Sequence, residues 1–222
     1  MPTKVACICC NGELHNKAEA KMLAENCDLL IAADGGADHL AQLALKPKLI
    51  IGDMDSLAQD PWQDDESLGR LCFPQDKDRS DTELAVEWAI EHEFNLVMLL
   101  ASTGRRIDHT LGQCALLLRF PGVVVICDDG FCVRGVSANQ QVGFQGQKGA
   151  LVSLIPFASN TRVTTSGLHY SLLNETLAHA THGLSNEISE GYCSISVSAG
   201  RLLLSVEGYA LLPKSIKSSL IA

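Results

Sequence analysis

The chain has 222 residues, 46% of them hydrophobic and 19% charged, so it can bury a core and is not expected to be disordered. Only 5% of the residues are aromatic and the formal net charge is −9, which disfavours partners such as nucleic acids or anionic membranes. No apolar run approaches the ~20 residues of a membrane-spanning helix, and the first residues do not resemble a secretory signal.

The cysteines indicate a reducing compartment. There are nine, an odd number, and most lie in apolar stretches. Cys7 and Cys10 form a C-x-x-C pattern inside a strand-like run, whereas a redox motif would stand at a helix start. Reduced thiols packed as small hydrophobes explain this pattern better than a redox or zinc site. We therefore expect a cytoplasmic protein.

Short apolar runs alternate with helical patterns through the first part of the chain. The runs are rich in Val, Ile and Leu, as in strands buried on both faces: Val5–Cys10, Leu29–Ala33, Leu49–Ile51, Leu71–Phe73, Leu96–Ala101 and Val123–Cys127. Helices are predicted at Ala37–Leu45, at Asp81–Glu93 after a capping box that starts at Ser80, and at His109–Phe120. Strand and helix alternation predicts a Rossmann-like α/β domain with a parallel sheet.

The second part of the chain has a different character. Residues 1–141 carry a net charge of −10 and residues 142–222 a net charge of +1. Tyr192–Ser198 alternates apolar and polar residues, Ala199-Gly200 suggests a turn, and Arg201–Glu207 alternates again, which predicts an antiparallel hairpin. Further strands are expected at Leu151–Ile155 and Thr161–Thr165. We predict an α/β domain at residues 1–138 and an all-β domain at 139–222, a β-sandwich or an open barrel.

Polar clusters follow the predicted strands directly, and in an open parallel sheet such loops gather along one edge. Asp53 and Asp55 could share a divalent cation, with Asp34 and Asp81 nearby, although an Asp-rich surface turn is an alternative. Asp34-Gly35-Gly36 could accommodate an anion at a helix start. Arg106-x-Asp108-His109 offers a phosphate-pairing cation, or else a salt bridge that caps the next helix.

These clusters resemble the ordered motifs of the thiamin pyrophosphokinases. The resemblance rests on six segments: Ala33-Asp34-Gly35-Gly36-Ala37, Gly52-Asp53-Met54-Asp55-Ser56, Asp76-Lys77-Asp78-Arg79-Ser80-Asp81, Gly104-Arg105-Arg106-Ile107-Asp108-His109, Gly167-Leu168-His169-Tyr170 and Gly183-Leu184-Ser185-Asn186-Glu187. It implies transfer of a diphosphoryl group from ATP to the hydroxyethyl oxygen of thiamin, giving thiamin diphosphate and AMP. It also implies a homodimer with active sites between the subunits.

Residue by residue, the resemblance implies Mg²⁺ ligands at Asp53, Asp55 and Asp81. It assigns nucleotide binding to Asp34, Gly35, Gly36, Lys77, Arg106, Asp108 and His109, and thiamin binding to Ser185, Asn186 and Tyr170. Asp55, Asp81, Arg106 and Asp108 would be the catalytic residues, with Asp81 or Asp108 orienting or deprotonating the hydroxyl. The sequence departs from the family at Ser102-Thr103-Gly104-Arg105, which has few glycines, and at His169, where Lys is frequent.

Three other functions remain open at this stage. They are a pyrophosphokinase for a hydroxymethyl pterin, a non-catalytic sensor of nucleotide or thiamin, and a metal-dependent phosphohydrolase. Each of these functions would use much of the same site. They differ in whether a product forms and in which product it is.

Overall fold

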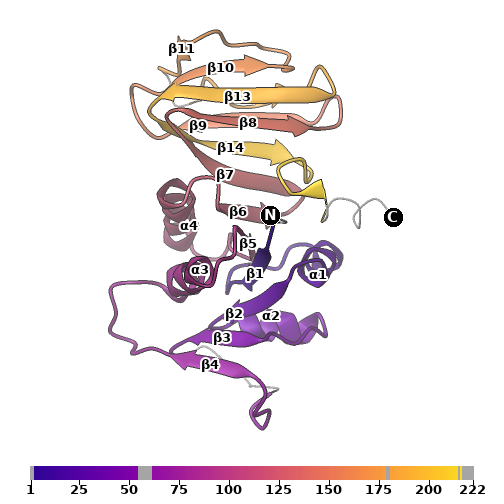
Figure 1. The fold of residues 1–222 in the computed structure, drawn as a ribbon, viewed down its shortest axis with the longest axis vertical. Coiled ribbons are helices and arrows are strands. Elements are labelled where there is room, and N and C mark those ends of the chain that lie inside the picture. The colour runs from indigo at the N-terminus through magenta and orange to yellow at the C-terminus, as the bar shows by residue number, and fades with distance from the viewer. Residues whose placement is uncertain (1–2, 55–61, 179–180, 215, 217–222) are drawn as a thin grey trace. The chain divides into compact units, whose positions relative to one another are not determined.

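The computed structural model describes residues 3–54, 62–178, 181–214 and 216 (Figure 1). The chain forms two compact units. The first runs to Gln113 and takes in the carboxyl-terminal stretch from Lys214, and the second runs from Cys114 to Pro213. Among the residues described, no helix is both long and apolar enough to cross a membrane.

The first unit is built on five parallel strands in the order β5-β1-β2-β3-β4. They are β1 (Val5–Cys9), β2 (Leu29–Ala33), β3 (Leu49–Gly52), β4 (Gly69–Cys72) and β5 (Leu96–Leu100). Each overlaps a predicted apolar run, β4 only at Leu71 and Cys72, and the predicted parallel pairing is confirmed. The expected burial on both faces is wrong for β4, where Leu71 is 36% exposed. The reason is that β4 ends this row of strands and pairs only with β3.

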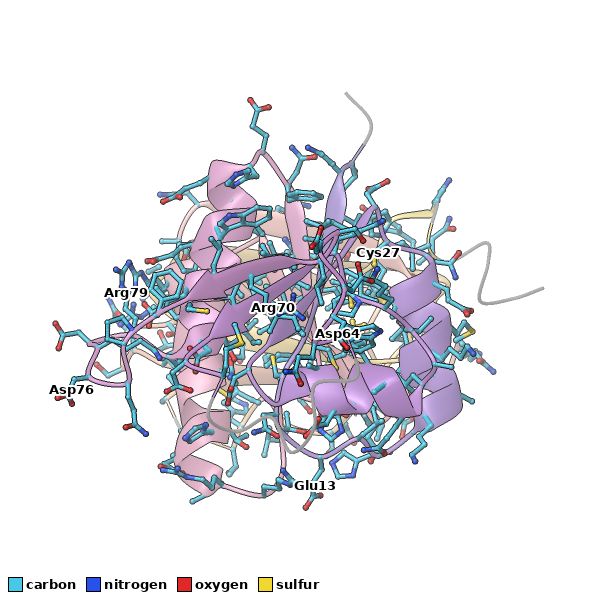
Figure 2. All side chains as sticks on the ribbon, turned by 90° about the horizontal axis from the view of Figure 1, so that it is seen from below. Glu13, Cys27, Asp64, Arg70, Asp76 and Arg79 are labelled. Atoms are coloured by element: carbon cyan, nitrogen blue, oxygen red, sulfur yellow. The ribbon has the colours of Figure 1, made fainter. Side chains whose placement is uncertain are left out.

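The described residues of the first unit form the helices α1 (Lys17–Glu25), α2 (Gly36–Gln42) and α3 (Asp81–Glu91), and α4 (Ile107–Arg119) begins in the first unit and ends in the second. Figures 1 and 2 show α1 and α2 on one side of the sheet and α3 on the other. The predicted start of α3 is confirmed, because the Ser80 hydroxyl accepts a hydrogen bond from Glu83 N at 3.2 Å. Such a cap satisfies a backbone donor that the first helical turn leaves unpaired.

The second unit contains nine strands: β6 (Val124–Asp128), β7 (Phe131–Ser137), β8 (Gln140–Gln145), β9 (Leu151–Pro156), β10 (Arg162–Ser166), β11 (Glu175–Thr176), β12 (Asn186–Glu187), β13 (Tyr192–Ala199) and β14 (Arg201–Glu207). They pair in two groups, β12-β9-β14-β7-β6 and β11-β10-β13-β8, with antiparallel neighbours throughout. The antiparallel character predicted for residues 139–222 is confirmed. The run at Val123–Cys127 was expected in the parallel sheet, but as β6 it pairs antiparallel with β7.

The predicted hairpin between β13 and β14 is wrong. Both strands form, but β13 pairs with β8 and β10 while β14 pairs with β7 and β9. Strand β13 buries alternate residues as predicted, including Ile195 at 0% exposure. In β14 the predicted alternation is wrong at Leu203, which is 2% exposed and buried between Leu202 and Leu204. Alternation reports only that one face of a strand is buried, and a strand that crosses to another sheet alternates in the same way as one that folds back.

Candidate active site

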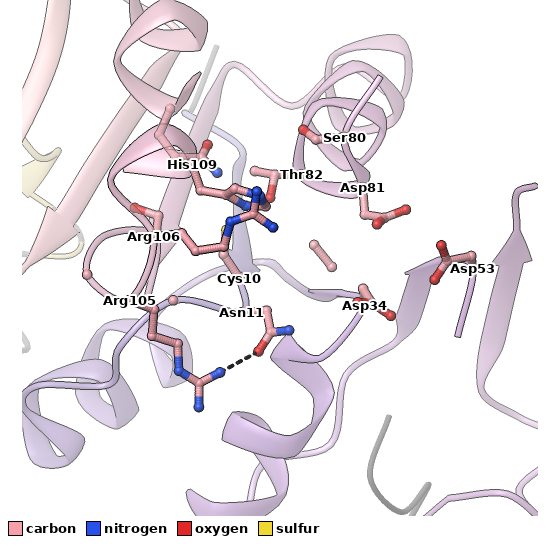
Figure 3. A pocket seen from close by; sticks show the side chains of 15 residues that line it. Cys10, Asn11, Asp34, Asp53, Ser80, Asp81, Thr82, Arg105, Arg106 and His109 are labelled. Atoms are coloured by element: carbon pink, nitrogen blue, oxygen red, sulfur yellow. Dashed lines mark hydrogen bonds between the residues drawn. The ribbon is translucent and has the colours of Figure 1, made fainter. Parts of the chain in front are cut away.

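A cavity of about 360 Å³ lies at the carboxyl ends of the parallel strands in the first unit (Figure 3). The loops after β1, β2, β3 and β5 contribute to it, together with the first residues of α3 and part of α4. Its lining comprises Cys10, Asn11, Gly12, Ala33, Asp34, Asp53, Ser80, Asp81, Thr82, Ser102, Gly104, Arg105, Arg106, His109 and Gln113. The predicted gathering of polar loops at one sheet edge is therefore confirmed.

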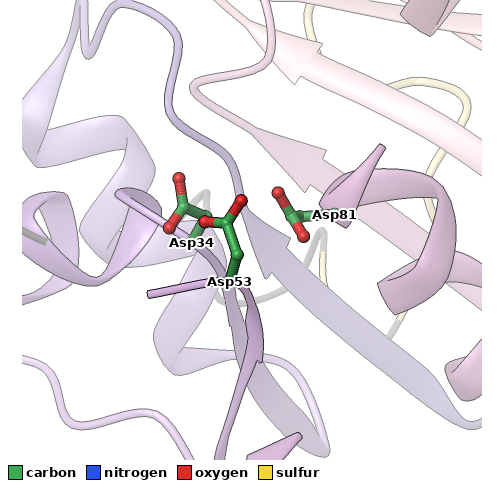
Figure 4. A group of neighbouring side chains, drawn as sticks. All are labelled: Asp34, Asp53 and Asp81. Carbon is green, nitrogen blue, oxygen red and sulfur yellow. The ribbon is translucent and has the colours of Figure 1, made fainter. Parts of the chain in front are cut away.

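Three carboxylates meet at one side of this cavity (Figures 3 and 4). Asp34 directly follows β2, Asp53 directly follows β3, and Asp81 is the first residue of α3. One oxygen from each lies within 4.8 Å of the others. Asp34 has a left-handed backbone, with φ of 48°, and is 8% exposed.

Lys77 lies against the same group. Its Nζ is 3.0 Å from an oxygen of Asp81 and 3.6 Å from one of Asp53. Partial burial lowers the pKa of Lys77, but the two carboxylates outweigh it and the net shift is upward. Burial raises the pKa of the Asp81 carboxyl, Lys77 opposes this, and the charges of Asp34 and Asp53 raise it further, for a net rise. Lys77 therefore acts as a counter-ion to the carboxylates.

Cationic side chains lie across the cavity from the carboxylates (Figure 3). Arg106 is held by Asp108 through two contacts, Nη2 to Oδ2 at 2.5 Å and Nε to Oδ1 at 3.1 Å. This pairing lowers the pKa of Asp108 to about 2 and raises that of Arg106. Arg106 and His109 both line the cavity, whereas the described lining does not include Asp108. Asp108 thus touches the site through Arg106.

Gly35 and Gly36 allow α2 to approach β1 closely. A Cβ atom on Gly36 would lie 2.0 Å from the carbonyl oxygen of Cys9, and one on Gly35 would lie 2.4 Å from the side chain of Asn11. Backbone cannot yield to such a contact, so position 36 requires glycine. The two glycines therefore position Asp34 and Asn11 at the cavity.

The predicted thiamin-binding residues lie in the second unit. The Asn186 side chain accepts hydrogen bonds from Tyr170 N at 3.0 Å and Glu187 N at 2.9 Å, and donates one to Tyr170 O at 2.8 Å. Asn186 is 8% exposed and Tyr170 is 67% exposed. Ser185 is exposed, with a left-handed φ of 57°. The Asn186 amide is thus engaged with the Tyr170 backbone, while Tyr170 and Ser185 present side chains to the surroundings.

The sequence assignments missed some cavity residues, and one assigned residue cannot be placed. Asp55, expected among the metal ligands and catalytic residues, lies outside the described residues. Asn11 and Arg105 line the cavity and received no role from the sequence. Asn11 lies two residues after the end of β1 and belongs to the polar clusters that the sequence predicts at this edge, so its place at the cavity was predictable although its role was not.

At the carboxyl ends of the parallel strands, carboxylates lie on one side of the cavity and guanidinium groups on the other. This arrangement is typical of α/β proteins that bind a metal-chelated phosphate compound. Comparison with known proteins then identifies the family. The model of the thiamin pyrophosphokinase catalytic domain matches residues 20–126, and that of the thiamin pyrophosphokinase vitamin B1 binding domain matches residues 139–202. The chain belongs to the thiamin pyrophosphokinase family and is an enzyme.

Individual relatives agree with this assignment. The chain is 26% identical over 188 residues to the thiamine pyrophosphokinase of Bacillus subtilis, covering 79% of this chain and 86% of the relative. It is 26% identical over 221 residues to thiamin pyrophosphokinase 1 of Caenorhabditis elegans, covering 90% and 88%. The crystal structure of the Bacillus subtilis protein has the same fold, with a TM-score of 0.79 at 24% identity over 92% of this chain and 99% of that chain.

Proposed function

We propose that the enzyme transfers the diphosphoryl group of ATP to the hydroxyethyl oxygen of thiamin, releasing thiamin diphosphate and AMP. The observation that carries this proposal is the meeting of Asp34, Asp53 and Asp81 opposite Arg106 in one cavity, in a chain of the thiamin pyrophosphokinase family. Such a cavity can hold a triphosphate through a divalent cation at one end and through cationic side chains at the other.

The carboxylates fit Mg²⁺. All the donors are oxygen atoms, which Mg²⁺ prefers, and within the described part of the chain Asp34 Oδ1 is buried without a hydrogen-bond donor. We propose Asp34 and Asp53 as ligands together with Asp81, and we retain Asp55 from the sequence assignment. Bound Mg²⁺ would neutralise phosphate charge and lower the electrostatic barrier to attack by an alcohol.

The protein's own residues would act mainly by positioning and charge, as in phosphoryl transfer generally. Lys77 and Arg106 would stabilise the negative charge that develops on the phosphate oxygens. This charge develops as the thiamin oxygen attacks the β-phosphorus in line with the departing AMP. Asp108 is committed to Arg106 and its pKa is about 2, so we propose that it orients this cation and does not serve as a base. Gly35, Gly36 and His109 complete the proposed nucleotide site.

We propose that Tyr170 and Ser185 contact thiamin and that Asn186 holds the Tyr170 backbone for this purpose. Thiamin is a cation, and the exposed ring of Tyr170 could bind it by a cation–π contact. We further propose the assembly that the family resemblance implies, a homodimer with active sites between subunits.

We also retain the predicted domain organisation. Residues 1–138 would form a Rossmann-like catalytic part and residues 139–222 a β-sandwich that binds thiamin, which the start of the second family match at residue 139 supports. A cytoplasmic location, with its supply of ATP, suits the cysteine-rich sequence.

The test incubates the enzyme with ATP, Mg²⁺ and thiamin and identifies the products by mass. We expect thiamin diphosphate and AMP, with turnover at least ~10²-fold lower in Asp53→Asn and unchanged in the exposed control Asp64→Asn. A faster reaction with a hydroxymethyl pterin, ATP binding without AMP release, or inorganic phosphate release without an acceptor would each contradict the proposal.

A further inference from the structure

Arg105 is held in the cavity by a set of contacts that the proposed function does not use. The loops after β1 and β5 run side by side, joined by hydrogen bonds from Gly12 N to Ala101 O at 2.7 Å and from Glu13 N to Thr103 O at 2.8 Å. Across them, Arg105 Nη1 donates to the side-chain oxygen of Asn11 at 3.2 Å (Figure 3). Both side chains line the cavity.

The backbone of Arg105 has an unfavourable conformation. Its φ is 49°, in the left-handed region, where a long side chain costs free energy that glycine would avoid. Strained backbone of this kind persists where the surrounding structure enforces it, and it is frequent at binding sites. Here Arg106 N donates to Gly104 O at 2.6 Å, which fixes the turn. Position 105 therefore holds an arginine although glycine would adopt this backbone conformation at a lower cost in free energy.

The charge of Arg105 is also available to a ligand. The charge of Arg106 is partly offset by its ion pair with Asp108, and that of Lys77 by Asp53 and Asp81. By contrast, within the described ranges the Arg105 guanidinium forms no ion pair and bonds to the neutral amide of Asn11, while the nearby Glu13 carboxylate accepts from the Arg105 backbone N at 3.4 Å. A guanidinium oriented by a neutral acceptor keeps its other N–H donors and its full charge for an anion.

We propose that Arg105, oriented by Asn11, binds a phosphate group of the nucleoside triphosphate. Figure 3 shows it on the side of the cavity away from Asp53 and Asp81, so it would contact phosphate oxygens other than those at the carboxylates. This inference rests on the proposed function, because it assumes that the ligand is a nucleotide. It makes Arg105 a determinant of affinity for nucleoside polyphosphates over the uncharged nucleoside.

Calorimetric titration of ATP and of adenosine, each in EDTA and with Mg²⁺, tests the proposal. For Arg105→Gln we expect about tenfold weaker ATP binding in both media and unchanged adenosine binding. For Asn11→Ala we expect a smaller loss in the same direction. Arg162→Gln, which removes an equal charge from an exposed site on β10, should bind ATP like the wild type.

Arg105→Gly separates binding from folding. Glycine relieves the left-handed backbone, so this variant should unfold at the same temperature as the wild type or a higher one while losing ATP affinity as Arg105→Gln does. ATP affinity within twofold of the wild type in both variants, or an equal loss of adenosine affinity, would overturn the assignment. If the wild type binds ATP without forming thiamin diphosphate, the proposed function fails, and the titration alone still decides the role of Arg105.

Discussion

At the scale of single residues, Asp34 illustrates the cost in stability that the proposed cation site would carry. Its buried carboxylate shares a small volume with Asp53 and Asp81, and like charges at such distances repel. Lys77 offsets part of this repulsion through Asp53 and Asp81. Functional sites commonly retain strained or repulsive groups that a more stable sequence would replace.

Asp34→Asn should therefore stabilise the protein while weakening the site. Asparagine tolerates the left-handed backbone at this position and removes one negative charge from the cluster. In EDTA we expect the free energy of unfolding to rise by about 1 kcal/mol. Mn²⁺ binding, followed by calorimetry, should weaken at least about tenfold. A destabilised variant with unchanged Mn²⁺ affinity would contradict this account.

Lys77→Met should have the opposite effect on the cation. The lysine ammonium would compete with a divalent ion for the same carboxylates, and its removal leaves a more negative cluster. We expect the Kd for Mn²⁺ in the absence of nucleotide to fall by about threefold or more. Turnover at saturating substrate should nevertheless drop, because the variant lacks the positive charge that we propose Lys77 offers to the phosphates. An unchanged or higher Kd would show that Lys77 does not share the cation's position.

At the scale of elements, the loops around the cavity are held by groups that do not themselves enter it. His39 on α2 is 8% exposed, and its Nε2 lies 2.9 Å from Gly12 O, an acceptor, so this nitrogen must carry the proton. Gly12 in turn bonds to the loop after β5, which carries Arg105. Helix α2 thus fixes the β1 and β5 loops together.

His39→Leu should impair nucleotide binding through this loop, and His39→Gln should largely restore it. Glutamine can supply an N–H to Gly12 O and leucine cannot. We expect the KM for ATP to rise several-fold in the leucine variant, with the KM for thiamin unchanged, and to return near the wild-type value in the glutamine variant. Equal effects of both variants on the two KM values would indicate a purely structural histidine.

In the second unit, Asn186 should behave as a positioning residue. Asn186→Ala leaves the N–H and carbonyl of Tyr170 without their partners, which should lower the free energy of unfolding by about 1–3 kcal/mol. It should also raise the KM for thiamin more than that for ATP. Gln147→Ala, the loss of an exposed amide from the same unit, serves as the matched control. Normal stability together with a raised thiamin KM would instead favour direct contact by Asn186.

Elements were predictable from sequence where local pattern determines them. The parallel strands and the start of α3 follow from apolar runs and the cap at Ser80. The partners of β13 and β14 did not follow, because alternation records a buried face and not the neighbouring strand. Likewise, the run at Val123–Cys127 forms β6, which pairs antiparallel with β7 across the Asp129-Gly130 turn.

At the scale of the whole molecule, the site was predictable to the extent that topology determines it. Loops at the carboxyl ends of parallel strands must meet, so Asp34, Asp53 and Asp81 could be grouped from their places after strands or at a helix start. Strand topology does not predict how long side chains such as lysine and arginine are oriented. The approach of Lys77 to the carboxylates and the anchoring of Arg105 by Asn11 therefore required the structure.

In the proposed reaction, ATP delivers its two terminal phosphates to thiamin as one unit. The most direct measurement follows ATP labelled at the γ-phosphate in a reaction with Mg²⁺ and thiamin, and identifies every labelled and adenylate product. Attack at the β-phosphorus predicts the label in thiamin diphosphate and an equal amount of unlabelled AMP. Label recovered as inorganic phosphate, or in thiamin monophosphate alongside ADP, would contradict the account.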